Sequence, residues 1–507
     1  MRRRWAVMAA MLPALAACQV GPDYERPPAD APAAYKEAPE GWKIAQPADA
    51  IARGTWWEIY SDPVLDGLER QVEVSNQNLK AFEAAFRQAS AIIREARASY
   101  FPTIEGSASV TRSQTGAGAT GSQNTVGGPG QPHTRYQVQG AVSDWELDLW
   151  GRIGRLVEGD IATAQASAGD LASARLSAQA QLATAYFQLR VSDALKRLFD
   201  SEVDAFARSL QITQNRYRAG TAARVDVVQA QAQLDSTRAQ AIAVGVQRAQ
   251  FEHAIAVLIG KAPAEFSLAP TTTVFTTPMV PPDLPSRLLE RRPDIAAAER
   301  RIAAANAQIG VAIAGYYPDL TFSASYGYQG ANVNTLFGPS TRFWSLGPNL
   351  AQTFFDGGLR HAQVDVARAS YDQAVANYRQ TVLTAFQQIE DNLASLRILE
   401  QQAAVQADAV RSAREAERLT LNQYLAGVVS YTNVITAQTV ALNNEQTELT
   451  ILQSRMVASV VLIQALGGGW NAQQLPPTGR PEEINIPPTE DVRPGWVKWV
   501  NKVIPWF

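Results

Sequence analysis

Apolar side chains recur every three or four residues over one very long stretch, from Arg152 to Ala219. Leu171, Leu182 and Leu189 belong to this stripe, and the stretch contains no proline. Gly220 follows it, and glycine commonly ends helices because it adopts the left-handed conformation without strain. The pattern predicts one uninterrupted helix. At about 1.5 Å per residue, this helix would be on the order of 100 Å long, several times the width of a compact domain.

The second half of the chain repeats the plan of the first. Residues 215–220, Asn-Arg-Tyr-Arg-Ala-Gly, recur at 422–427 as Asn-Gln-Tyr-Leu-Ala-Gly, an offset of 207. Nearer the start of each half, Ala-Ser-Tyr-Phe-Pro at 98–102 matches Ala-Gly-Tyr-Tyr-Pro at 314–318, an offset of 216. A unit of about 200 residues is longer than any solenoid repeat. The sequence therefore predicts an internal duplication of a whole half-domain.

Two segments in each half alternate apolar and polar residues, as a β-strand with two different faces does. They predict hairpins at about 103–148 and 319–355. The second strand of the second hairpin is expected at Phe343–Phe354. The polar series is uncharged for most of its length. The apolar series comprises Ile104, Gly106, Ala108, Val110, Tyr136, Val138, Gly140, Val142, Leu320, Phe322, Ala324, Tyr326, Tyr328, Trp344, Leu346 and Leu350.

A soluble β-sandwich would need a second sheet to cover these apolar faces, and the sequence predicts none. Aromatic residues also gather toward the strand ends, as in the interfacial girdle of a membrane barrel: Tyr136, Trp145, Tyr326, Tyr328, Phe343 and Trp344. A lipid-facing barrel therefore fits better. Four strands cannot close, because the narrowest membrane barrels use about eight. Three chains would give twelve strands, the smallest multiple of four that we expect to leave an open lumen.

The start of the chain has the pattern of a bacterial lipoprotein signal. Three arginines precede an apolar run that is too short to span a bilayer, and Leu15-Ala-Ala17 precedes the only cysteine, Cys18. We expect cleavage before Cys18 and its modification by diacylglycerol and fatty acyl groups such as palmitate. An ordinary signal peptide with a cysteine at its cleavage site is the alternative. Gln19 stands where an aspartate would favour retention in the inner membrane, so the outer membrane is the expected destination.

These patterns divide the chain into a signal peptide at 1–17, an extended proline-rich arm at 18–62, a first repeat at 63–270, a second repeat at 271–469 and a tail at 470–507. Beyond the hairpins, the first repeat should contain two helices broken near Ser75-Asn76, the long helix at about 152–219 and a helix at about 224–260. The second repeat should contain a helix that starts within 284–295, a long helix at about 359–426 and a helix at about 431–466.

Composition and motifs exclude several functions. The net charge of −3 over 507 residues leaves no basic face for nucleic acid. Gly260-Lys261 lacks the leading glycine of a phosphate-binding loop, because Ile255 stands there, and the three histidines lack metal-ligand spacing: His133, His253 and His361. We therefore expect no enzyme activity, no metal and no cofactor beyond the lipid on Cys18.

Four features together resemble the NodT branch of the TolC-like outer-membrane efflux factors. They are the lipoprotein signal, the duplicated halves, Trp56-Trp57 with Asp62-Pro-Val-Leu65, and Leu-Pro-Ser-Arg-Leu-Leu-Glu-Arg-Arg-Pro-Asp-Ile at 284–295. The resemblance covers nearly the whole mature chain. It implies an α+β membrane protein in which three chains form a TolC-like 12-stranded β-barrel, four strands per chain. A long α-helical barrel with an equatorial domain would continue it through the periplasm.

The same resemblance implies the function. The homotrimer would be the exit duct of a tripartite efflux system in the Gram-negative outer membrane, anchored by its lipid and inserted by its barrel. It would conduct small molecules such as drugs passively, from a periplasmic membrane-fusion adaptor and an inner-membrane resistance-nodulation-division pump, and so contribute to antibiotic resistance. Two alternatives remain: the outer-membrane component of a type I protein secretion system, and a non-conducting periplasmic coiled-coil scaffold. The lipoprotein signal and the motif at 287–294 favour efflux over protein secretion.

In the family, the turns near Gly220 and Gly427 are periplasmic tips at which the pore closes. At the offset of 207, four charged residues of the first tip lose their charge in the second: Arg216, Arg218, Arg224 and Asp226 become Gln423, Leu425, Tyr431 and Asn433. Asn433 and Thr436 occupy places where relatives can carry acidic rings. Our hypothesis is a gate in which Asp226 is hydrogen-bonded to Tyr424 or paired with an arginine.

Overall fold

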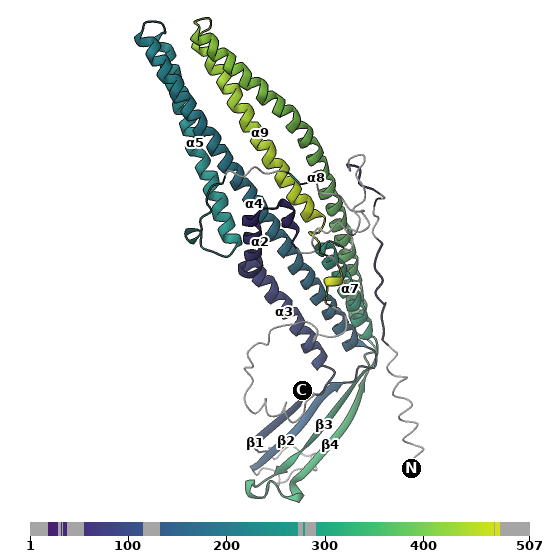
Figure 1. Ribbon diagram of the computed structural model, residues 1–507. Helices are drawn as coiled ribbons and strands as arrows, with labels where there is room; N and C mark the ends of the chain where they lie inside the picture. Colours follow the sequence, from purple (N-terminus) through teal and green to yellow (C-terminus); the bar gives the residue numbers. More distant parts are fainter. Residues whose placement is uncertain are drawn as a thin grey trace.

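The computed structural model describes residues 19–28, 32, 34–37, 55–114, 132–271, 277–278, 291–470 and 472–476. A four-stranded sheet forms one end of the molecule, and the long helices extend away from it (Figure 1). The helices are α2 (Pro63–Ser75), α3 (Gln77–Ala98), α4 (Arg152–Arg218), α5 (Arg224–Leu258), α7 (Pro293–Ala314), α8 (Leu359–Leu425) and α9 (Tyr431–Ala465). The strands are β1 (Ile104–Ser113), β2 (His133–Glu146), β3 (Asp319–Gly330) and β4 (Arg342–Ala351).

The duplication seen in the sequence is also present in the helices. The long helices α4 and α8 each contain 67 residues. Their following partners α5 and α9 each contain 35 residues, and α3 and α7, which precede the hairpins, each contain 22. Helix α4 is uninterrupted and begins at the expected residue. Each copy thus supplies one 22-residue helix, one β-hairpin and one very long pair of antiparallel helices, and the first copy has α2 in addition.

Glycines end the long helices by the same device in both copies. At the end of α4, Gly220 has a φ of 73°, and the N–H of Thr221 donates to the carbonyl of Arg216 at 2.9 Å. Gly427 ends α8 in the same way, with a φ of 77°. These are Schellman motifs, which satisfy carbonyls that the helix leaves unpaired. The far ends of the long helix pairs are therefore sharp turns.

Polar caps position the short helices against the long ones. Asn76 separates α2 from α3, where the break is predicted: its side chain accepts from the N–H of Asn78 at 2.9 Å and donates to the carbonyl of Leu258 at 2.8 Å. Asp62 caps α2 and accepts a hydrogen bond of 2.5 Å from the hydroxyl of Tyr186 on α4. The Asp-Pro motif is therefore a helix start that also binds the long helix.

The motif at 284–295 has a structural role in its described part. Arg292 pairs with Asp294 at 2.6 Å and donates to the side chain of Gln388 on α8 at 2.9 Å. It also donates to the carbonyl of Ala465, the last residue of α9, at 3.2 Å. Arg292 thus fastens the start of α7 to both helices of the second long pair. Residues 284–290 lie outside the described residues, and α7 itself begins at Pro293.

The four strands form one antiparallel sheet in the order β1-β2-β3-β4. Its register places the apolar series opposite one another: Ile104 faces Val142, Val138 faces Tyr328, and Tyr326 faces Trp344. The sheet therefore has one apolar and one polar face, as the alternation predicts. A bulge between Val142 and Trp145 interrupts the pairing of β2 with β3, and the alternation of apolar and polar residues does not predict it.

Strand β4 is shorter than predicted. It ends at Ala351 instead of Phe354, and Phe354 and Phe355 are 95% and 90% exposed. The chain turns here because Gly357 and Gly358 both have positive φ and Asp356 accepts hydrogen bonds from the backbone N–H groups of Gly358 and Arg360 at the start of α8. The helix start therefore ends the strand early.

The two largest apolar clusters of the described residues lie between the helices. The larger lies near the middle of the long helices and includes Trp56 and Trp57, each only 1% exposed, with Leu182 and Tyr378. The smaller lies toward the turns and joins α4 and α5 to α8 and α9. The predicted signal peptide with Cys18, about half of the arm, residues 115–131 and the tail from 477 lie outside the described residues.

Candidate functional site

Arg216 joins the two helix turns at the end of the molecule farthest from the sheet. Its guanidinium donates to the carbonyl oxygens of Tyr424 and Leu425, both at 2.9 Å, and its carbon atom Cζ lies 4.6 Å from the centre of the Tyr424 ring. These carbonyls belong to the last residues of α8, where the helix leaves them unpaired and its dipole is negative. A cation from the first turn therefore stabilises the second turn, and the contact fixes one against the other.

Tyr424 belongs to a buried aromatic pair inside this contact. It is 4% exposed, and its ring centre lies 5.2 Å from that of Tyr431 at the start of α9. Tyr431 forms a hydrogen bond of 3.0 Å with Ser209 on α4, and burial raises the pKa of its hydroxyl. Sequence reasoning noted Tyr431 only as the position where Arg224 loses its charge. Tyr431 is an aromatic residue at the first position of α9, and this feature of the sequence could have indicated packing there.

No hydrogen bond joins the other polar residues predicted for the gate to the side chain of Tyr424 among the described residues. Arg218 donates to Asn215 on its own helix at 2.7 Å. Asp226 is half-buried in the first turn of α5, while three more residues are exposed: Arg224, Asn433 and Thr436. The Tyr424 hydroxyl is buried and has no hydrogen-bond partner among the described residues, so Asp226 does not bind it within one chain. A contact between neighbouring chains stays a prediction.

The sheet presents its polar face as a nearly uncharged surface. The strand register places serines opposite glutamines on this face: Ser107 is opposite Gln139, and Ser109 is opposite Gln137. A charge stands toward each end, with Arg135 opposite Thr111 and Glu105 opposite Ala141. Within the described residues, β1 and β4 each pair with one strand only. Both outer edges of the sheet therefore keep unpaired backbone groups.

The residues directly after Cys18 are bound where β2 leads into α4. The N–H of Val20 donates to the carbonyl of Trp150 at 3.1 Å. Arg155, which is 2% exposed, donates to the carbonyls of Val20 at 3.1 Å and Gly21 at 3.2 Å, and to the carboxylate of Asp23 at 2.9 Å. A buried guanidinium needs such partners. This stretch of the arm is therefore a fixed part of the fold at the base of the sheet.

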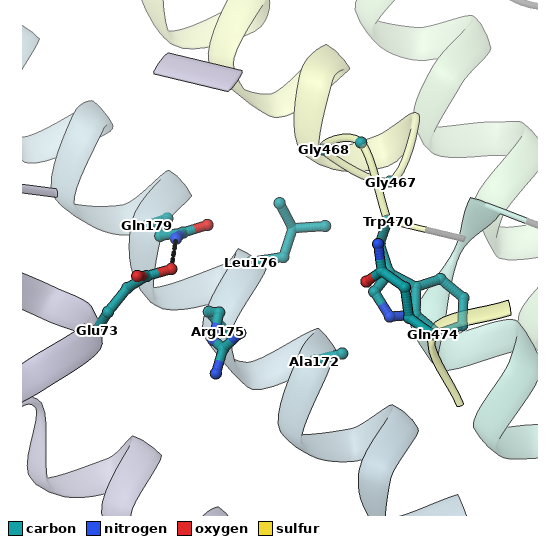
Figure 2. Close-up of a pocket in the computed structure, with 10 residues that line it drawn as sticks. Glu73, Ala172, Arg175, Leu176, Gln179, Gly467, Gly468, Trp470 and Gln474 are labelled. Atoms are coloured by element: carbon teal, nitrogen blue, oxygen red, sulfur yellow. Dashed lines mark hydrogen bonds between the residues drawn. The ribbon is translucent and has the colours of Figure 1, made fainter. Parts of the chain in front are cut away.

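A small pocket lies between α2, α4 and the glycines that follow α9 (Figure 2). Its volume is about 90 Å³, and the side chain of Gln179 donates to Glu73 at its rim at 3.4 Å. Pockets that enclose drug-sized ligands usually measure about 300–1,000 Å³. It is too small to be a binding site for such a ligand.

Two kinds of feature are absent from the described residues. No group of three or more histidine, cysteine, aspartate or glutamate side chains is arranged to hold a metal ion in the part of the chain that the structure describes. None of the described helices combines the length and the apolar character that crossing a membrane requires.

Comparison with known proteins gives one consistent result. Residues 68–261 and 284–468, which correspond to the two repeats, match the outer membrane efflux protein family. The chain is 30% identical over 468 residues to the probable efflux pump outer membrane protein TtgC of Pseudomonas putida, covering 90% of this chain and 94% of that protein. It is 31% identical over 461 residues to the outer membrane protein OprJ of Pseudomonas aeruginosa, covering 90% and 94%.

Solved structures agree with these relatives. The outer-membrane channel OprN superposes with a TM-score of 0.80 at 29% identity, over 89% of this chain and all of that one. The CmeC outer membrane channel of Campylobacter jejuni, at 22% identity, has the same fold, with a TM-score of 0.84 over 90% of this chain and 96% of that one.

Proposed function

The chain belongs to the outer membrane efflux protein family, and from this we propose that three copies of it form the exit duct of a tripartite efflux pump. It is located in the outer membrane and is a passive channel, not an enzyme. In the proposed assembly its partners are a periplasmic membrane-fusion adaptor and an inner-membrane resistance-nodulation-division pump. The cargo is small molecules such as drugs.

The observation that carries this proposal is the two-faced sheet with two open edges. In lipid, an unpaired strand edge is not tolerated, because no water can satisfy its backbone groups. Pairing β4 of one copy with β1 of the next satisfies both edges, and three copies make twelve strands. The apolar face then meets lipid and the polar face lines an aqueous lumen.

The helices extend this lumen away from the membrane. They run from the base of the sheet to the two turns, so that the sheet and the turns lie at opposite ends of the molecule (Figure 1). In the proposed trimer, six such turns surround the periplasmic entrance. We assign the gate to them: Arg216, Arg218, Gly220, Arg224 and Asp226 on the first turn, and Tyr424, Gly427, Asn433 and Thr436 on the second.

Two measurements on the full chain test this function. Purified protein in detergent should have about three times the mass of the 55.0 kDa chain once bound detergent is subtracted. In a planar lipid bilayer the same preparation should give discrete conductance steps. A stable monomer with a closed barrel, or a trimer that never conducts, would be incompatible with the proposed duct.

We also propose that Cys18 carries the lipid anchor. The position of the residues after Cys18 supports this proposal. Val20 is hydrogen-bonded to Trp150 at the base of the sheet, where the proposed barrel would reach the membrane boundary. Mass spectrometry of the mature N-terminal peptide should detect diacylglycerol and fatty acyl groups on Cys18, and an unmodified amine at another residue would refute it. The Cys18→Ser variant should still insert, because a closed barrel holds itself in lipid and one lipidated residue adds a weaker attachment.

A further inference from the structure

The four long helices form two tightly packed hairpins that meet along a limited seam. Helix α4 packs along α5, and α8 packs along α9, while contact between the hairpins is mainly that of α4 with α9. The turns at the ends of the hairpins carry the proposed gate. Contacts that cross the seam therefore decide how the two turns are held relative to each other.

One guanidinium crosses this seam at a distance from the turns. Arg414 on α8 bonds Glu445 on α9, Glu202 on α4 at 2.6 Å and Glu417 on its own helix at 2.8 Å. Arg414 lies about 15 Å before Tyr424 along α8. A single side chain thus joins three of the four long helices between the central core and the turns.

Negative charge is in excess in this cluster. Three carboxylates share one cation, so the cluster carries a net charge of −2 when all are ionised. Glu202 is 4% exposed, and burial raises the pKa of its carboxyl. Its second oxygen, Oε2, is buried with no hydrogen-bond partner among the described residues. Without Arg414, the carboxylates would repel one another, and Glu202 would be left buried and unpaired on the facing hairpin.

The duplication gives no second copy of this cluster. At the offset of 207, Arg414 corresponds to Ala207 and Glu202 corresponds to Ala409. In a ring of chains, the cluster would therefore be present where the two hairpins of one chain meet, and absent where hairpins of neighbouring chains meet.

We propose that Arg414 is an ionic latch that holds the α8–α9 hairpin on α4 and so keeps the turns in their closed arrangement. This inference rests on the proposed channel function. Arg414 touches no gate residue and acts as a positioning residue. Arg216 fastens the turns at their ends, and Arg414 fastens the hairpins that carry them.

The same helix supplies a matched control. Arg418, one turn beyond Arg414, forms an ion pair of the same length, 2.6 Å, with Glu415. Both members of that pair lie on α8 and are exposed, so the pair does not cross the seam. The two arginines therefore differ in what they join and not in residue type.

The experiment compares Arg414→Met with Arg418→Met in planar bilayers, at equal amounts of purified trimer. Arg414→Met should raise the open probability about tenfold, while Arg418→Met should leave it within about twofold of wild type. Adding Glu202→Gln to Arg414→Met should keep the open probability raised, because the double variant still lacks the connection between α8 and α4. A purely structural role would lower the melting temperature of the trimer without changing the open probability.

Equal open probabilities in Arg414→Met and wild type would overturn the latch, as would an equal rise in Arg418→Met. If Arg414→Met does not assemble, Glu202→Gln alone replaces the charged acceptor on α4 by a neutral amide, which weakens the connection to α4 and leaves Arg414 with its other two partners. It should then raise the open probability by a smaller factor, and no rise would again refute the latch. A wild-type trimer that does not conduct refutes the channel itself, which separates the two failures.

Discussion

Replacing Ala324 by arginine should prevent the protein from accumulating as a stable trimer in the outer membrane. Ala324 lies midway along the apolar face, opposite Val142 on one side and Leu346 on the other. An arginine on the lipid face of a barrel costs about 2–4 kcal/mol near the midplane of the bilayer, so three copies cost roughly 6–12 kcal/mol. That is comparable with the total stability of many proteins. The fraction of trimer in isolated outer membranes measures the effect.

The neighbouring residue provides the control for this experiment. Ser325 lies on the polar face, opposite Ala141 and Ser345. Since this face lines the proposed lumen, Ser325→Arg should leave the amount of trimer near that of wild type and change the conductance instead. An equal loss of trimer in both variants, or in neither, would contradict the assignment of the two faces.

Removing the carboxylate of Asp226 or the hydroxyl of Tyr424 should open the channel. Each such contact is worth on the order of 1 kcal/mol, and three copies act together. The combined term would shift the balance between open and closed states by about a hundredfold. Single-channel recordings of Asp226→Ala and Tyr424→Phe should each show a higher conductance or open probability than wild type.

The structure makes this prediction more selective. The Tyr424 hydroxyl has no hydrogen-bond partner in the described part of the chain, and Arg216 binds the backbone of Tyr424 instead of its hydroxyl. Tyr424→Phe should therefore leave the hydrogen bonds within one chain intact, so an effect of this variant would come from a contact formed in the assembled trimer. Asp235→Ala, a change on the exposed side of α5 away from the turns, should give wild-type currents. Wild-type currents from both gate variants would leave Asp226 and Tyr424 without a role in closure.

Periodic features of the fold could be predicted from the sequence. The bounds of the long helix follow from a stripe without proline and a terminal glycine, and the two faces of the sheet follow from strict alternation. The motif at 284–295 indicated the family, but it did not predict the contacts that Arg292 makes. The end of β4 was misplaced because Phe354 continues the apolar pattern, whereas Asp356 and the following glycines start a helix.

Contacts between distant segments could not be predicted in this way. Arg155 binds residues near the start of the chain, and Arg414 binds Glu202 on another hairpin. Neither pairing leaves a local pattern, because arginines and glutamates are also common on solvated helix faces. The gate shows both limits. Aligning the copies identified Tyr424, yet the guanidinium of Arg216 against its ring and backbone emerged only from the packing of α4 beside the end of α8.

The equal lengths of the paired helices constrain how such a chain can evolve. If α4 alone gained one helical turn of residues, the connection between α4 and α5 would no longer lie level with the connection between α8 and α9. The four helices α4, α5, α8 and α9 can therefore change length only together. The hairpin loops carry no such constraint. Nineteen residues separate β1 from β2 and eleven separate β3 from β4, although the helices around them have kept the same lengths. Insertions and deletions that survive selection should therefore accumulate at the loops beyond the sheet, where the molecule would face the outside of the cell.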